Sequence, residues 1–303
     1  MYKYKNILIG LALSHQDGSA IRYAAMLSWF TKPEKITFLH IVSGHNIPED
    51  LRIEYPELVL PIDEYAKDKM EALVKKHFDG YPNAQIDYEV IEGSPLVEFL
   101  RLVKYKKIDL IVTRKRKRPI ARGTLSELLA RMVPCSVFFI PEGAESKINN
   151  ILVPVDFSEN SAIAMEEAIA FASNTGVKEL HCLHVYSMPI AYYKTGKTYE
   201  QFAEIMKGHA KKNYQKFINK LDLKDIHVYP TFKLDQKASR GIWETTEEHQ
   251  VDLIIVGARG RRAAAGMLLG SITEQLIRTT SIPLLAVKKK VLGMSILDAI
   301  LKL

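Results

Sequence analysis

Glycines that follow a short apolar run in the second half of the chain have the spacing of a phosphate-binding loop. Two residues separate Gly257 from Gly260, and nine residues separate Gly260 from Gly270. Glycine lets backbone N–H groups approach an anion because it has no Cβ. Ser271 then opens a run that predicts a helix, whose N-terminus offers unpaired N–H groups to an anion. The pattern predicts a phosphate cradle. A glycine-rich loop before a capped helix is the alternative left open.

Side chains next to these glycines could strengthen such a site. The hydroxyls of Ser271 and Thr273 could donate to phosphate oxygens. Arg259, Arg261 and Arg262 would add positive charge at its mouth.

A carboxylate follows the first apolar run of the same half. Asp156 comes directly after residues 151–155, and a buried charge is costly unless it is paired, hydrogen-bonded or metal-bound. Asp156 could therefore bind Mg²⁺ or accept a hydrogen bond from a ribose hydroxyl. It could instead cap the helix that follows, although Ser158 could do so equally well.

The elements that position these residues alternate along the chain. Short β-branched runs, such as residues 36–42 and 110–112, are typical of strands buried on both faces of a parallel sheet. Runs with apolar residues three and four apart, such as 62–78 and 202–221, predict helices that bury one face. Strand–helix alternation predicts an α/β, doubly wound parallel sheet, in which ligands bind outside the carboxyl ends of the strands.

The sequence is duplicated. Residues 6–10, 39–42, 108–112 and 123–127 resemble residues 150–154, 183–186, 251–255 and 270–274, at offsets of 143 to 147. This period is far longer than that of solenoid repeats. It predicts two tandem domains, residues 1–143 and 147–290, joined by a polar segment that contains Pro141 and Gly143. Residues 291–303 form an apolar C-terminal tail.

Composition excludes several classes of protein. The chain has 303 residues, a net charge of +7 and two cysteines, which excludes a disulfide framework and a four-cysteine zinc site. No apolar stretch reaches the roughly 18 residues of a membrane span, and residues 7–13 are short for a secretion signal. We therefore expect a cytoplasmic protein that does not bind membranes.

The motifs together resemble the universal stress protein family. They are Pro154-x-Asp156, Leu183-His184-Val185 and the glycine pattern that ends at Gly270-Ser271. The resemblance extends to about Lys290 and is to the nucleotide-binding branch, in tandem form. It implies Rossmann-like domains similar to the adenine nucleotide alpha hydrolases, each with a five-stranded parallel sheet.

The resemblance also implies roles for particular residues. Asp156 would face ribose or a metal ion, with Pro154 beside it, and the backbone of Val185 would read the adenine edge. The ribose and phosphates would be lined by Val256, Gly257, Arg259 and Gly260. The residues that would close over the phosphates are Gly270, Ser271, Ile272 and Thr273. The expected ligand is ATP, with Mg²⁺ held by Asp156.

The first copy departs from this pattern. Ala12 aligns with Asp156, Arg114 with Gly257 and Lys117 with Gly260, so we expect no ATP there. Residues 114–118 are instead five consecutive basic residues, which predict either a solvated loop or a polyanion site. They lack aromatic residues for base stacking, so we do not expect specific nucleic-acid recognition.

No nucleophile is paired with an obvious base, so no catalytic residue is assigned. We expect an ATP-binding, nucleotide-dependent regulator of a stress response, with its site in the second domain only. We also expect an unidentified protein partner and a homo-oligomer such as a dimer. A nucleotide-independent adaptor or chaperone-like module and a slow Mg²⁺-dependent ATPase are the alternatives.

Overall fold

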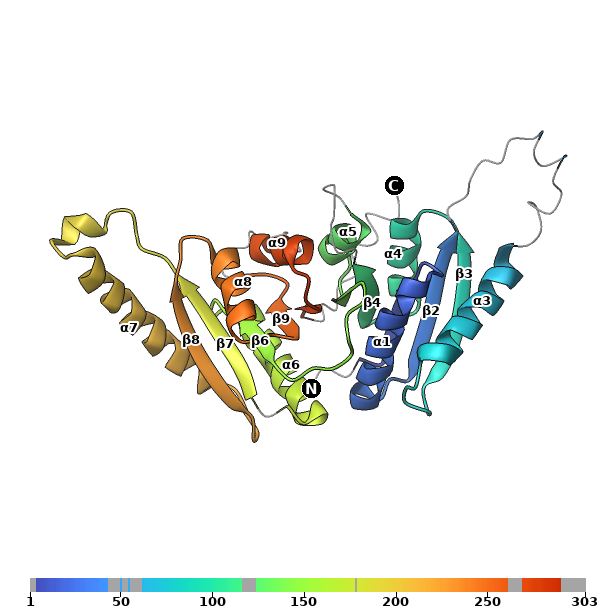
Figure 1. The fold of residues 1–303 in the computed structure, drawn as a ribbon, viewed down its shortest axis with the longest axis horizontal. Helices are drawn as coiled ribbons and strands as arrows, with labels where there is room; N and C mark the ends of the chain where they lie inside the picture. The colour runs from blue at the N-terminus through green and yellow to red at the C-terminus, as the bar shows by residue number, and fades with distance from the viewer. Residues whose placement is uncertain are drawn as a thin grey trace. The chain divides into compact units, whose positions relative to one another are not determined.

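The chain folds into two compact units, which meet in sequence between Ser146 and Lys147. The computed structural model describes residues 4–42, 50, 54, 62–115, 124–177, 179–260 and 269–289 (Figure 1). The tail 291–303 and residues 116–118 of the basic run lie outside the described residues. Each unit is considered by itself.

The N-terminal unit is an α/β sheet of five parallel strands in the order β3-β2-β1-β4-β5. Helices α1 and α3 contact each other, and so do α4 and α5. Its main elements are β1 (Asn6–Leu11), α1 (Gly18–Thr31), β2 (Lys35–Val42), α3 (Ile62–His77), β3 (Gln85–Glu92), α4 (Pro95–Tyr105), β4 (Leu110–Lys115), α5 (Leu125–Met132) and β5 (Ser136–Pro141).

The C-terminal unit repeats this topology in the order β8-β7-β6-β9-β10, again with parallel pairing. Its main elements are β6 (Ile151–Pro154), α6 (Glu159–Thr175), β7 (Glu179–Tyr186), α7 (Tyr199–Ile218), β8 (His227–Leu234), α8 (Ala238–Glu248), β9 (Leu253–Gly257), α9 (Ser271–Thr279) and β10 (Leu284–Val287). A 3-10 turn (Tyr192–Thr195) precedes α7.

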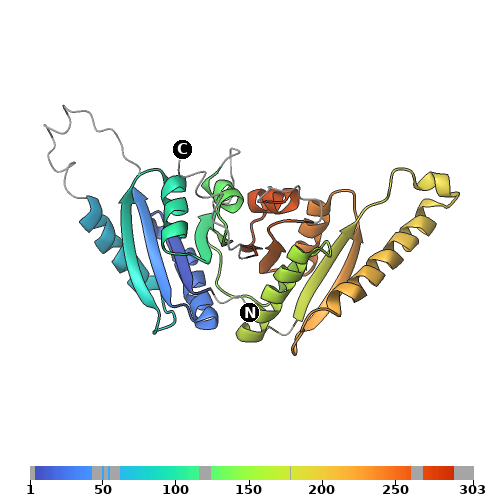
Figure 2. The same cartoon turned by 180° about the vertical axis from the view of Figure 1, so that it is seen from behind.

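In both units the chain starts at the middle strand, winds two strands outward, and then returns to add two strands on the other side. Right-handed crossovers then place the first two helices of each unit on one face of its sheet and the last two on the other, as the two opposite views show (Figures 1 and 2). In the C-terminal unit the winding reverses between β6 and β9, so the crevice at their carboxyl ends is where a ligand is expected.

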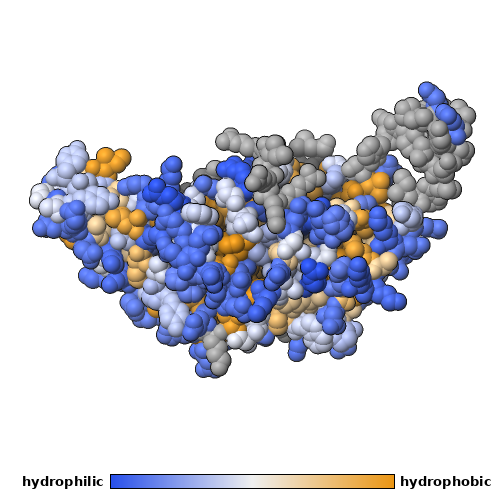
Figure 3. Space-filling model, viewed as in Figure 1, coloured by the Kyte–Doolittle hydropathy of each residue, from blue (hydrophilic) through white to orange (hydrophobic). Residues whose placement is uncertain are grey.

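The cores explain why these strands read as continuous apolar runs. The side chains of β5, β9 and β10 are buried throughout, because helices cover both faces of each sheet. Polar side chains are left to the helix surfaces, and the face in Figure 3 is predominantly hydrophilic. In the described part of the chain, no helix has the length and apolar character to cross a membrane. The α/β, doubly wound fold predicted from the sequence is confirmed.

Candidate functional site

A strained turn joins β6 to α6 and points the side chains of Asp156 and Phe157 in different directions. Phe157 has a φ of +62°, a left-handed conformation that is uncommon for a bulky residue. Leu13 has a φ of +55° at the corresponding place of the N-terminal unit, so the kink belongs to the fold. It directs the Asp156 carboxylate toward Gly260 and the Phe157 ring against His184 and Phe217.

The Asp156 carboxylate is oriented by the first turn of α6. Its Oδ1 accepts hydrogen bonds from the Ser158 N–H at 3.1 Å and from the Ser161 hydroxyl at 2.6 Å. The helix itself is capped by Ser158, whose side chain accepts from the Ser161 N–H. Of the two roles that the sequence left open, the helix cap therefore belongs to Ser158, and Asp156 points into the crevice.

The glycines of the motif serve two different purposes. A Cβ at Gly257 would lie 2.7 Å from the Asn160 carbonyl oxygen, so this glycine is required by the packing of β9 against α6. A Cβ at Gly260 would instead lie 2.8 Å from Asp156 Oδ2. The Gly270 N–H donates to the Ala258 carbonyl at 2.7 Å. Gly260 thus leaves room for the Asp156 carboxylate, and Gly270 brings the start of α9 against the end of β9.

Helix α9 begins at this point with its N-terminus uncapped by any described side chain. Its N-cap residue is Gly270 in an extended conformation, and Ser271 is exposed. Thr273 is only 3% exposed, and its hydroxyl donates to the Gly257 carbonyl at 2.9 Å. Ser271 is therefore the hydroxyl available to a ligand, whereas Thr273 and the half-buried Ile272 offer their backbone N–H groups.

Strand β7 brings its backbone to the same crevice. The Leu183 carbonyl accepts from the Val155 N–H at 2.8 Å, so Leu183 bonds on the β6 side. Alternate residues of a strand bond to the same neighbour, and Val185 therefore directs its N–H and C=O past the end of β6. Pro154 ends β6 opposite Leu183. Val256 is buried in β9, and the partly exposed Arg259 precedes Gly260.

The structure thus gathers the residues predicted from the sequence at the carboxyl ends of β6, β7 and β9 and at the start of α9. Sequence reasoning missed Ser161, which fixes Asp156. It named His184 within a motif but gave it no role; in the structure His184 Nδ1 lies 2.8 Å from the Val155 carbonyl oxygen, and its ring lies 4.2 Å from that of Phe157. The spacing Asp156-x-Ser158-x-x-Ser161 was the available signal for Ser161.

The same place in the N-terminal unit is filled by the chain's own side chains. Asp17 stands where the other unit has Ser161, is fully buried, and accepts from the Ala12 and Ser14 N–H groups at 3.0 and 2.9 Å. Arg114, at the position of Gly257, places its guanidinium 3.7 Å from Asp17 and donates to Ser14 and Gln16. An internal ion pair therefore lies at the place that corresponds to the candidate site of the other unit.

This arrangement concerns only the first two residues of the basic run, because residues 116–118 lie outside the described residues. Arg114 is 15% exposed and ends in that ion pair, so it does not face solvent as part of a polyanion site. Lys115 is 4% exposed in β4, and burial lowers its pKa to about 8 against the opposing effect of Glu127. Two of the five basic residues are therefore turned inward.

Titratable side chains elsewhere in the described residues do not gather into a metal site. No cluster of three or more histidine, cysteine, aspartate or glutamate side chains among the described residues could hold a metal ion. Cys135 and Cys182 are buried, as predicted, and burial raises the pKa of Cys182 to about 12.

A doubly wound parallel sheet with a carboxylate after its first strand and a glycine motif after its fourth defines the class of this protein. The universal stress protein family model matches residues 3–141 and 147–288, and the chain belongs to that family. Two copies of the family domain account for both units.

Relatives support this assignment. Universal stress protein MJ0577 of Methanocaldococcus jannaschii is 31% identical over 46% of this chain and 94% of its own length. A universal stress protein of Mycolicibacterium smegmatis is 27% identical over 94% of this chain and 97% of its own. The solved universal stress protein of Archaeoglobus fulgidus has a TM-score of 0.59 at 20% identity, over 94% of this chain and 96% of its own, and shows the shared fold.

Proposed function

We propose that the C-terminal unit binds ATP in the crevice between β6, β7 and β9. The observation that carries the proposal is the joint placement of Asp156, Gly260 and the uncapped start of α9. A carboxylate, an open glycine and free helix N–H groups converge there, and together they suit the ribose and phosphates of a nucleotide. The motif spacing found in the sequence supports the same ligand.

Each part of the nucleotide has a counterpart in this arrangement. The backbone of Val185 pairs with the adenine edge, because it points past the end of β6 into the crevice. Asp156 faces the ribose or the metal ion, with Pro154 beside it. The phosphates lie against Gly257, Gly260 and Gly270 and the N–H groups of residues 271–273, with Arg259 adding positive charge. Val256 forms the buried wall of β9 behind them.

The residues fit a magnesium ion that arrives with the nucleotide. Mg²⁺ usually keeps several waters and is held by one or two carboxylates and substrate phosphates. Asp156 supplies one carboxylate, with Oδ1 fixed by Ser158 and Ser161 and Oδ2 turned to the space at Gly260. Bound there, the ion would neutralise phosphate charge.

The N-terminal unit is proposed to bind no ATP. The guanidinium of Arg114 occupies the crevice, and Asp17 is already paired with it. The chain therefore has one nucleotide site, and its occupancy is the signal through which this protein acts in a stress response. A nucleotide-dependent contact with a protein partner is the simplest form of such regulation.

Calorimetric titration of Mg²⁺·ATP into the full chain tests the site. Gly260→Asp places a second carboxylate against Asp156 and is expected to abolish binding while the circular dichroism spectrum is retained. Gly208→Asp is the matched control, because it changes the charge equally in the same unit, at a position in α7 where a Cβ would have nothing within 4 Å. Equal affinity in the native protein and a folded Gly260→Asp variant would refute the site.

A further inference from the structure

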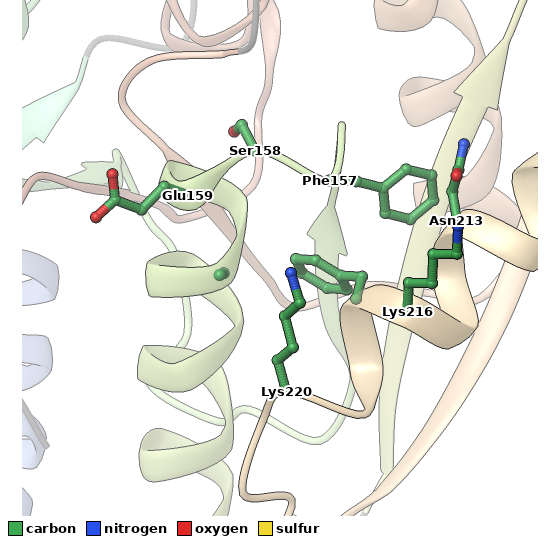
Figure 4. A pocket seen from close by; sticks show the side chains of 8 residues that line it. Phe157, Ser158, Glu159, Asn213, Lys216 and Lys220 are labelled. Carbon is green, nitrogen blue, oxygen red and sulfur yellow. The ribbon is translucent and has the colours of Figure 1, made fainter.

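A separate cavity of about 410 Å³ lies between the first turn of α6 and the second half of α7 (Figure 4). The strained turn at Phe157 separates it from the crevice, since Asp156 points to one side and Phe157 to the other. None of the residues assigned to the nucleotide lines this cavity. Whatever binds there uses different side chains.

The wall of the cavity is aromatic. The rings of Phe157 and Phe217 have centroids 5.6 Å apart and a tilt of 59° between their planes. Phe157 is held from behind by the His184 ring, at 4.2 Å. Phe217 is buried in the face of α7 that packs on the sheet. Two fixed rings offer an apolar, planar group a surface for stacking.

The rim of the cavity is cationic. Lys216 lies in the last turn of α7, and Lys220 follows two residues after the end of that helix. Both are exposed, and within the described part of the chain neither forms an ion pair. Glu159 is the one carboxylate among the described lining residues. Its Oε1 lies 2.5 Å from Lys289 Nζ, and its side chain points away from the cavity (Figure 4). Two ammonium groups at the rim of one cavity repel each other, so an anion between them would be stabilised.

The fold alone does not require this cavity. Gly18 is the N-terminal counterpart of Ala162, which lines the cavity, and a Cβ there would lie 3.2 Å from the His77 imidazole and 3.2 Å from the Arg22 guanidinium. In that unit, side chains of α1 and α3 cover the corresponding surface. In the C-terminal unit, Lys216 and Lys220 lie at the rim instead, and the half-buried Phe157 lines the cavity.

We propose that this cavity binds an organic anion that joins a flat apolar body to a carboxylate, sulfonate or phosphate group. The apolar body lies against Phe157 and Phe217, and the acidic group lies between Lys216 and Lys220. The proposal is independent of nucleotide binding in the crevice, because the two sites share no side chain.

Two fluorescent probes of nearly equal shape test both halves of the proposal on the full chain. 8-Anilinonaphthalene-1-sulfonate carries the anionic group, and N-phenyl-1-naphthylamine has the same rings without it. We expect one sulfonate probe per chain, bound about tenfold or more tighter than the neutral probe, as for a charge-assisted contact. Lys216→Glu with Lys220→Glu should remove that difference. Lys211→Glu with Lys212→Glu changes the charge equally on exposed residues of α7 outside the cavity and should leave it intact.

Titration in the presence of saturating Mg²⁺·ATP, and with the Gly260→Asp variant, separates the two sites. Retained sulfonate-probe binding in both cases is the expected result. Native affinity in a folded Lys216→Glu, Lys220→Glu variant would overturn the proposal, as would competitive displacement by ATP. Equal affinity for the two probes would also overturn it, because it would leave the lysines without a role.

Discussion

Replacing Gly260 with alanine probes the candidate site with the smallest possible change. The added methyl would lie 2.8 Å from Asp156 Oδ2, closer than carbon and oxygen approach without displacement. The nearest atom is the end of a side chain, so Asp156 can yield by rotating. Rotation breaks the hydrogen bonds that Oδ1 accepts from Ser158 and Ser161 and turns the carboxylate from the position in which it would meet a ribose or a metal ion.

The expected loss can be estimated from the bonds involved. The bond lost from the complex is the one that the Asp156 carboxylate would accept from the ribose. A hydrogen bond to a charged group contributes about 1.5–3 kcal/mol, which corresponds to a loss of about 10- to 150-fold in ATP affinity. The free energy of unfolding should change by less, about 1 kcal/mol, because Asp156 is only partly buried and alanine restricts the unfolded chain more than glycine does. The variant is therefore expected to fold and to bind poorly.

Calorimetry with Mg²⁺·ATP and urea unfolding, performed on the same preparations, measure both quantities. Gly208→Ala provides the control, because a Cβ at this position in α7 would have nothing within 4 Å. It should leave ATP affinity unchanged and raise stability by about 0.5–1 kcal/mol. An unchanged affinity in Gly260→Ala would show that Asp156 and Gly260 do not form the site.

Three further predictions concern the supporting structure. Gly257→Ala should lower the free energy of unfolding by about 1–3 kcal/mol, because its methyl meets the Asn160 backbone; unchanged urea unfolding would contradict this. Arg114→Ala should lower the free energy of unfolding by about 1–3 kcal/mol, because it leaves the buried Asp17 carboxylate without its ionic partner. It should create no second ATP site. Calorimetric denaturation and ATP titration test the two parts. Because burial raises the pKa of Cys182 to about 12, its thiol stays protonated at pH 8, and neither it nor the buried Cys135 should react with Ellman's reagent until guanidinium is added. A thiol that reacts rapidly in the native protein would contradict that packing.

The fold was predictable because its signals are local. Apolar runs of strand length, helical stripes between them and an internal repeat at about 144 residues fixed the strand–helix alternation. Residue type and position limited the cap of α6 to Asp156 or Ser158, and the structure assigns it to Ser158. Asp156 also fell at the end of its strand, where the sequence placed it, because a carboxylate cannot continue a strand buried on both faces.

The directions of individual side chains were not predictable, because they depend on contacts distant in sequence. The sequence suggests only a phosphate-binding role for Gly257, whereas the structure adds a packing requirement, because a Cβ there would meet the backbone of Asn160, almost 100 residues earlier. The sequence suggests that the Thr273 hydroxyl donates a hydrogen bond to a phosphate, yet in the structure it donates to the Gly257 carbonyl. Arg114 belongs to a basic run that the sequence suggests is exposed, but its guanidinium is mostly buried beside Asp17.

The number of nucleotides on the native chain tests the central claim most directly. Released small molecules from denatured protein would be identified by mass spectrometry, and the emptied protein would be titrated with Mg²⁺·ATP in a calorimeter. We predict ATP at about one per chain. Two per chain would contradict the closed crevice of the N-terminal unit, and no nucleotide and no heat would contradict the site formed by Asp156, Gly260 and α9.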